Sequence, residues 1–322
     1  MKIGKLTNEE LNKVVLDKLH ISRKEVLIGS GIGVDCAALD LGGEYCVLST
    51  DPITAAEAGA GALAVHISAN DIAASGGEPF AMLVTILLPP QYDLVQLGAM
   101  MEEIYREANR LHIDVVGGHT EVTDAVNKAV ISVAAIGKTK KILRYEDARP
   151  GDKLILTKQC GIEGGIILCK DHPEAAEAFL DTSEKALLPE MEQQLSVVKE
   201  ARIAAQMGAI AMHDITEGGV FGAAYEMAEA TGLGLCIDEA AIAVHPVAQK
   251  ACAHFDLNPY RLISSGSLLV IWHGDEQPLL QALKDEGIFA ACIGEFTQGE
   301  ICTVESGILM PPTQDELFKI KK

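Results

Sequence analysis

Hydrophobic residues recur along the first half of the chain with two spacings, one typical of helices and one typical of strands. Apolar positions three and four residues apart predict helices over 7–20, 61–77 and 94–113. Continuous or alternating apolar runs predict strands over 44–53, 80–89 and 129–139. We expect a further strand to begin at Asp114 and to run into a turn at Gly117-Gly118.

A polar run that contains Pro150-Gly151 interrupts this alternation, so we place a domain boundary near residue 148. Beyond it a strand is expected over 153–157. Further helices are predicted over 163–169, 174–180, 196–207 and 218–231, and strands over 210–213, 234–237, 267–273 and 290–296. The pattern indicates an α+β or mixed α/β chain in two domains, residues 1–148 and 149–322.

Composition and charge narrow the function. The chain has 322 residues, of which 48% are hydrophobic and only 4% aromatic, so aliphatic residues must fill a sizeable core. The formal charge of −20 argues against nucleic acid and against anionic membrane surfaces as partners. A phosphorylated ligand would have to be held locally, by backbone amides and a divalent metal.

Two further features indicate a cytoplasmic protein. The N-terminus MKIGKLTNEE has no apolar signal core, and no window is long and apolar enough for a membrane span. The eight cysteines contain no CxxC pair, so we interpret them as reduced, packed thiols.

Several polar residues stand where strands and loops are expected to end. The glycine-rich loop with Gly31, Gly33 and Asp35 allows close approach of backbone to an anion, or is a simple turn. Asp51 is expected to end its strand, where a ligand group or a plain turn acid is found.

Asn70 and Asp71 lie side by side in an apolar, small-residue segment. Burying an uncompensated carboxylate is costly, so Asp71 needs a metal ion or another partner. The alternative is that the pair caps a helix that begins near Ile72.

Two more stretches combine glycines with polar residues. His119 follows a Gly pair and is either a functional imidazole or a structural one. In the second domain Asp214 closes a short apolar strand, and Gly218-Gly219 open a helix whose amides could receive a phosphate. The Ser-rich turn LISSGS carries the weakest signal. The sequence shows no catalytic Ser-His-Asp order and no Walker A loop.

The order of these stretches resembles that of one superfamily. The likeness is carried by GIGVDCAAL, STDPI, SANDIAASGGEP, VVGGHTEVT, ARPGDKLILTK, HDITEGGV and LISSGSLLV. Together they look like the ATP-binding PurM-like proteins, which include aminoimidazole ribonucleotide synthetase, selenophosphate synthetase, thiamine-monophosphate kinase and HypE. The chain most resembles the AIR synthase-related, HypE-like group.

This resemblance implies a two-domain PurM-like fold, a homodimer joined through the N-terminal sheets, and ATP and Mg²⁺ as cofactors. It implies Asp35, Asp51, Asp71 and Asp214 as metal ligands and Asp71, His119 and Asp214 as catalytic residues. The nucleotide-binding positions that it implies are Gly31, Gly33, Asp35, Asp51, Asn70, Gly118, Thr120, Gly218 and Gly219.

The sequence also departs from members of this superfamily. HypE proteins end in a cysteine-bearing tail, whereas this chain has no cysteine after Cys302, which argues against their cyanation chemistry. Thiamine-monophosphate kinases carry an acid where His119 stands.

We therefore expect an ATP- and Mg²⁺-dependent enzyme that phosphorylates or activates an amide- or carboxyl-type oxygen of an unidentified small molecule. The alternatives are an ATP-binding regulatory or maturation-complex protein with a protein partner, and a kinase similar to thiamine-monophosphate kinase.

Overall fold

The computed structural model of the protein describes residues 8–9, 24, 26–28, 31–32, 34, 36–54, 59–305, 307–311 and 314–320. They form two compact units. The N-terminal unit holds the described residues of 24–28 and 36–142, and the C-terminal unit those of 8–9, 31–34 and 143–320. The predicted helix over 7–20 falls almost entirely outside the described residues, as do the candidate site residues Gly33 and Asp35.

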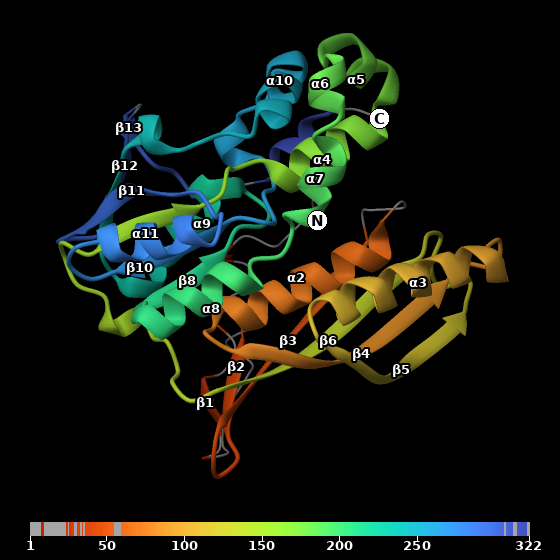
Figure 1. Ribbon diagram of the computed structural model, residues 1–322, viewed down its shortest axis with the longest axis horizontal. Helices are drawn as coiled ribbons and strands as arrows, with labels where there is room; N and C mark the ends of the chain where they lie inside the picture. Colours follow the sequence, from red (N-terminus) through yellow and green to blue (C-terminus); the bar gives the residue numbers. More distant parts are fainter. Residues whose placement is uncertain are drawn as a thin grey trace. The chain divides into compact units, whose positions relative to one another are not determined.

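A sheet with helices on one face forms the N-terminal unit. Among the described residues it has six strands in the order β1-β2-β3-β6-β4-β5, antiparallel except for the parallel pair β4–β5. Helices α2 and α3 cover one face of this sheet (Figure 1). The elements are β1 (Val26–Ile28), β2 (Ala37–Asp40), β3 (Tyr45–Ile53), α2 (Ala60–Ala74), β4 (Glu78–Leu88), α3 (Leu94–Arg110), β5 (Asp114–Val122) and β6 (Val130–Thr139).

Glycines let α2 lie directly on the strands beneath it. A Cβ atom at Gly137 of β6 would lie 2.2 Å from Cγ2 of Ile72, and one at Gly77 would lie 2.6 Å from Cγ2 of Val47. Ile72 and Val47 are both buried. The small residues of this region therefore allow helix and sheet to pack at close range.

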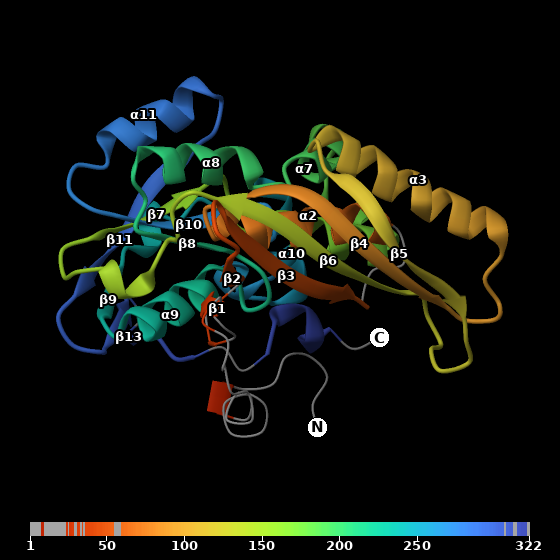
Figure 2. The same ribbon diagram turned by 90° about the horizontal axis from the view of Figure 1, so that it is seen from below.

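The C-terminal unit is built on a second sheet. Its seven described strands have the order β13-β12-β9-β11-β7-β10-β8. Figure 2 shows α8 and α11 on one face of this sheet and α9 on the other. The strands are β7 (Lys153–Thr157), β8 (Ala211–Asp214), β9 (Gly234–Ile237), β10 (Leu268–Trp272), β11 (Ala290–Thr297), β12 (Cys302–Val304) and β13 (Gly307–Ile308).

The helices of this unit are more numerous than the sequence pattern indicates. They are α4 (Ile162–Asp171), α5 (Pro173–Phe179), α6 (Thr182–Lys185), α7 (Leu188–Gln193), α8 (Val198–Met207), α9 (Gly219–Thr231), α10 (Pro246–Phe255) and α11 (Gln277–Asp285). Short 3₁₀ turns are η2 (Tyr145–Asp147), η3 (Glu239–Ala241), η4 (Pro259–Arg261) and η5 (Glu316–Lys319). The main core of the unit lies between α9 and the sheet and includes Phe221, Met227, Leu269 and Phe296.

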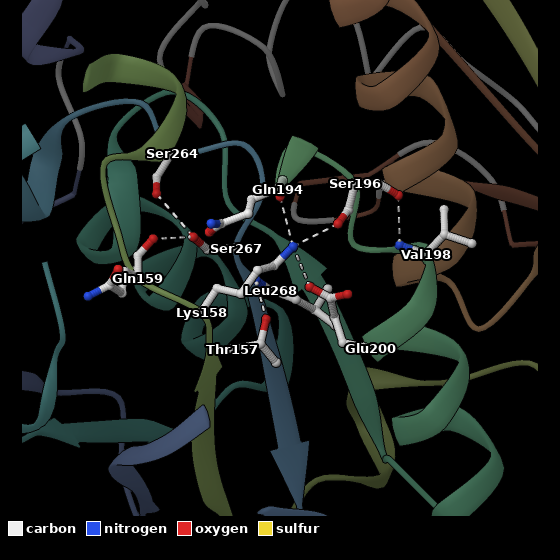
Figure 3. A network of polar contacts seen from close by, with 10 residues as sticks. All are labelled: Thr157, Lys158, Gln159, Gln194, Ser196, Val198, Glu200, Ser264, Ser267 and Leu268. Atoms are coloured by element: carbon white, nitrogen blue, oxygen red, sulfur yellow. Dashed lines mark hydrogen bonds and ion pairs between the residues drawn. The ribbon is translucent and has the colours of Figure 1, made fainter. Parts of the chain in front are cut away.

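A largely enclosed lysine, with its side chain 13% exposed, fixes the loop between α7 and α8. Nζ of Lys158 donates to the carbonyl oxygens of Gln194, at 2.8 Å, and Ser196, at 2.7 Å (Figure 3). It also lies 2.7 Å from Oε1 of Glu200, whose side chain is 2% exposed. Lys158 adopts φ 55°, so the ammonium is held in place at some cost in backbone strain.

All eight cysteines are free thiols, and five of them are buried, in keeping with a packing role. Over the part of the chain that the structure describes, no helix is both long and apolar enough to cross a membrane.

Candidate functional site

Asp71 lies inside α2, not at its start. The helix runs from Ala60 to Ala74, so the alternative in which Asn70 and Asp71 cap a helix beginning near Ile72 is wrong. Asn70 is fully buried and Asp71 is 6% exposed. The Ser49 hydroxyl of β3 donates a short hydrogen bond to Oδ2 of Asp71.

Asp51 lies on the same side of the sheet as Asp71. We predicted that it ends its strand, but β3 continues through Pro52 to Ile53 and pairs with β6 along that length. Pro52 is tolerated because β2 pairs only with Tyr45–Leu48, so one edge of β3 is open beyond that point. Residues two apart share a face, so Asp51 faces α2 as Ser49 does.

A further oxygen of α2 lies close in sequence to Asp71. Ser68 is 1% exposed, and its Oγ has no hydrogen-bond partner among the described residues. Side chains three residues apart share a helix face, so this hydroxyl lies on the Asp71 side of α2. Sequence reasoning missed both Ser49 and Ser68, because serine is common in such segments and only the packing of α2 on β3 gives them meaning.

Strand β5 runs straight through the glycines that we expected to form a turn. It continues from Asp114 to Val122 and pairs in parallel with β4, with Gly118 opposite Val84. A Cβ atom at Gly118 would lie 1.8 Å from the carbonyl oxygen of Val84, and φ is 150°. The glycine is therefore required by close strand pairing and not by chain reversal.

His119 and Asp71 lie on opposite faces of the N-terminal sheet. In the parallel register His119 is opposite Thr85, and Thr120 is opposite the buried Ile86. Side chains alternate along a strand, so Thr120 points to the helix face and His119 to the face without helices. His119 is exposed, and its Nε2 lies 3.4 Å from Oε2 of Glu121.

In the C-terminal unit Asp214 ends β8, as predicted, and is 1% exposed. The preceding His213 is also buried, and its Nε2 lies 3.0 Å from Oε2 of Glu226 on α9. This contact fixes the end of β8 against α9. Gly31 is described within this unit as well.

The glycine pair before α9 does not present free amides. The N–H of Gly218 donates to Oδ2 of Asp315 at 2.8 Å, and the N–H of Gly219 donates to the carbonyl oxygen of Thr216 at 3.1 Å. The expectation that both amides are free for a phosphate is therefore wrong: the C-terminal segment occupies that of Gly218, and Thr216 occupies that of Gly219.

The Ser-rich turn before β10 has a structural role. Ser264 Oγ accepts the N–H of Gly161 at the start of α4, at 2.7 Å. Figure 3 shows Ser267, whose Oγ donates to the carbonyl oxygen of Gln159 at 2.8 Å. Glu163 accepts the N–H of Ser265 at 3.2 Å. The first bond satisfies the amide of the residue that caps α4, and the other two tie the serine turn to the segment around the start of this helix.

The donor set of the N-terminal unit suits a hard cation. Ser49, Asp51, Ser68 and Asp71 all offer oxygen, which is what Mg²⁺ prefers. Among the described residues no three acidic, imidazole or thiol side chains come together as a complete metal site.

Family models of known proteins match both halves of the chain. The model of the N-terminal domain of AIR synthase related proteins matches residues 33–139, and that of their C-terminal domain matches residues 149–306. The chain is therefore a two-domain, mixed α/β protein of the PurM-like superfamily. Within that superfamily it belongs to the AIR synthase related family.

Its relatives include hydrogenase maturation proteins. A hydrogenase expression/formation protein of Methanocaldococcus jannaschii is 27% identical over 310 residues, 92% of this chain and 89% of the relative. Carbamoyl dehydratase HypE of Escherichia coli is 27% identical over 277 residues, 82% of this chain and 80% of the relative. A crystal structure of HypE in complex with ATP shares the fold, with a TM-score of 0.72 at 21% identity, over 97% of this chain and 96% of that one.

Proposed function

We propose that this chain is an ATP- and Mg²⁺-dependent enzyme that phosphorylates or activates an amide- or carboxyl-type oxygen of a small molecule. One observation carries the proposal: Asp71 is a nearly buried carboxylate in the interior of a helix, beside the oxygens of Ser49 and Ser68. A carboxylate grouped with hydroxyl oxygens offers the hard oxygen ligands that Mg²⁺ prefers.

Asp71 and Asp51 would hold Mg²⁺ in the N-terminal unit, with Asp35 as a proposed third acid outside the described residues. The bound ion would neutralise phosphate charge during transfer of the γ-phosphoryl group. The hydrogen bond from Ser49 fixes the orientation of the Asp71 carboxylate. We assign Asn70, Gly118, Thr120, Gly31 and Gly33 to nucleotide binding.

Asp214 of the C-terminal unit is proposed as a further metal and catalytic residue. It is held at the end of β8, where the His213–Glu226 contact restricts its movement. Gly218 is assigned to the nucleotide, on condition that the C-terminal segment leaves its amide, whereas the amide of Gly219 stays bonded to Thr216.

We propose a homodimer joined through the N-terminal sheets. β5 is an edge strand among the described strands, and every one of its residues is exposed, including Val116 at 60% and Val122 at 62%. A long exposed edge with apolar side chains favours pairing with another chain. His119 stays a proposed catalytic residue on the face of the sheet without helices, opposite the face of Asp71.

The name of one relative, a hydrogenase expression/formation protein, favours a role in a maturation pathway. We propose that this role involves a protein partner and takes place in the cytoplasm. A second candidate function, favoured by the same name, is a chain that binds ATP in a maturation complex and turns over little of it.

Release of ADP tests the proposal. The purified chain is incubated with Mg-ATP and a panel of small amides, carboxylates, carbamoyl compounds and thiamine monophosphate. ADP formation that needs one class of acceptor, and that is lost in Asp71→Asn but kept in the exposed control Asp285→Asn, supports the enzyme. ATP binding with no turnover on any acceptor supports the maturation-complex function instead.

A further inference from the structure

The last described residues, 314–320, place two carboxylates inside the C-terminal unit. Asp315 is 2% exposed and Glu316 is 3% exposed. Oδ2 of Asp315 accepts the N–H of Gly218 at 2.8 Å, and Oε2 of Glu316 accepts the N–H of Asn258 at 3.0 Å. The segment is thus held by side chains that reach backbone amides of distant elements.

Apolar contacts complete the docking of this segment. Leu317 and Ile320 pack against a small core cluster formed by Leu168, Ala251, Cys252, Leu257 and Leu262. Oδ1 of Asp315 accepts the N–H of Leu317 at 3.0 Å and so begins η5. One carboxylate therefore both starts the short helix and ties it to Gly218.

Asp315 is surrounded by other acids. Burial raises the pKa of Asp315 to about 6, and the carboxylates of Glu217 and Glu316 add to this, against the hydrogen bonds from Leu317 and Gly218. Burial likewise raises the pKa of Glu163 on α4 to about 7, and Asp315 and Glu217 contribute.

The other ionisable groups near this segment do not offset the acids around Asp315. Lys319 forms an ion pair with Glu316, and Arg261 interacts electrostatically with the same carboxylate. The thiol of Cys252 on α10 has its pKa raised to about 12 by burial, with Glu316 and Asp315 adding to it. An ionised Asp315 is therefore poorly accommodated where it is docked.

We propose that residues 314–320 form a strap that docks through Asp315 and is released as this carboxyl group loses its proton. The docked strap occupies the amide of Gly218. The effect of strap docking on activity rests on the proposed function, in which the amide of Gly218 is assigned to the nucleotide.

The direction of the pH effect follows from linkage. A carboxyl group whose pKa is raised by docking binds its proton more tightly in the docked state than in the released one. Docking is therefore strongest below the ordinary pKa of 3.8 and is lost as the pH rises through about 6. Between pH 5.5 and pH 8 the docking equilibrium constant should fall about fourfold.

Amide hydrogen exchange of the full chain tests the strap without nucleotide. After correction for intrinsic rates, protection of the amides of Leu317, Phe318 and Ile320 should fall about fourfold from pH 5.5 to pH 8. In Asp315→Asn, which cannot ionise, protection of these amides should hardly change over that range. Equal pH dependence in the native chain and this variant would overturn the proposal.

A second variant guards against loss of docking in Asp315→Asn, since asparagine offers one acceptor oxygen where aspartate offers two. Glu217→Gln removes a carboxylate that adds to the raised pKa of Asp315 and keeps Asp315 itself, so the loss of protection should move to lower pH. An unshifted profile would overturn the strap. The two proposals fail separately: absence of ATP binding leaves the exchange result untouched, and a pH-independent strap leaves ATP binding untouched.

Discussion

Nε2 of His66 on α2 lies 3.2 Å from Oε2 of Glu107 on α3, and both side chains are nearly buried, at 2% and 10% exposed. Nε of Arg106 donates to the other carboxylate oxygen at 2.9 Å. This contact is a polar link between the two helices that cover the N-terminal sheet, and α2 carries Asp71. The geometry of the proposed site therefore depends on it.

Glu107→Gln should weaken this link and destabilise the protein. The hydrogen bond from His66 lowers the pKa of Glu107 to about 2, and Arg106 adds to this, although burial opposes it. We expect a loss of roughly 2 kcal/mol in the free energy of unfolding at pH 7. A carboxyl group whose pKa is lowered by folding stabilises the folded protein at pH values above its unfolded pKa. The difference in unfolding free energy between the native chain and Glu107→Gln should therefore vanish as the pH falls from 4.5 towards about 2.

Urea unfolding of both proteins at several pH values measures this difference. Glu102→Gln on the exposed side of α3 is the control, with an expected change below about 0.5 kcal/mol. Equal stability of Glu107→Gln and the native chain at pH 7 would show that the buried contact is not stabilising.

Lys158→Met should be more damaging, because it leaves the carboxylate of Glu200 buried without its ammonium partner. Breaking such a pair costs roughly 3–5 kcal/mol. The matched control is Lys199→Met, whose partner Glu286 forms an exposed pair, with side chains 50% and 54% exposed. That pair should contribute less than about 1 kcal/mol. Thermal unfolding of the two variants should rank them in this order, and the reverse order would contradict the network of Figure 3.

Gly118→Ala should disturb the pairing of β4 and β5. A Cβ atom there meets the Val84 carbonyl at 1.8 Å, and the residue has a positive φ of 150°. We expect a loss of roughly 3 kcal/mol or more in unfolding free energy. Gly117→Ala is the matched control, because its Cβ would lie 3.3 Å from the flexible end of Leu83. If both variants have the same denaturant midpoint of unfolding as the native chain, the assignment of Gly118 to strand pairing fails.

Much of the fold follows from the hydrophobic pattern. The predicted strands over 153–157 and 234–237 coincide with β7 and β9, because both are short apolar runs bounded by turn residues. Helices α10 and α11 were missed, although each has Pro in its first turn, which is a signal for a helix start. The turn expected at Gly117-Gly118 was wrong because β4, a distant segment, holds the glycines in a strand.

The candidate site, like the fold, could be predicted only where the signal lies in the local sequence. The position of Asp71 in a helix and that of Asp214 at a strand end could be predicted from local sequence. The Ser49–Asp71 contact joins residues 22 apart, and the Gly218–Asp315 contact joins residues 97 apart. Neither has a local signature, since both arise from the packing of elements that are remote in sequence.

Lysine at the exposed edge of the N-terminal sheet should prevent self-association. In sedimentation velocity we expect the native chain to sediment as a dimer and the double variant Val116→Lys, Val122→Lys as a monomer. Phe289→Lys, a similarly exposed apolar residue in the C-terminal unit, is the control and should leave the dimer intact. A monomeric native chain at micromolar concentration would contradict the proposed homodimer.

The central claim is that Asp71 holds Mg-ATP, and isothermal titration tests it most directly. Mg-ATP is titrated into the native chain, into Asp71→Asn and into the exposed control Asp285→Asn, with unfolding curves to show that each is folded. We predict saturable binding to the native chain and the control and at least tenfold weaker binding to Asp71→Asn. Unchanged affinity in Asp71→Asn, or no binding to the native chain, would contradict the claim.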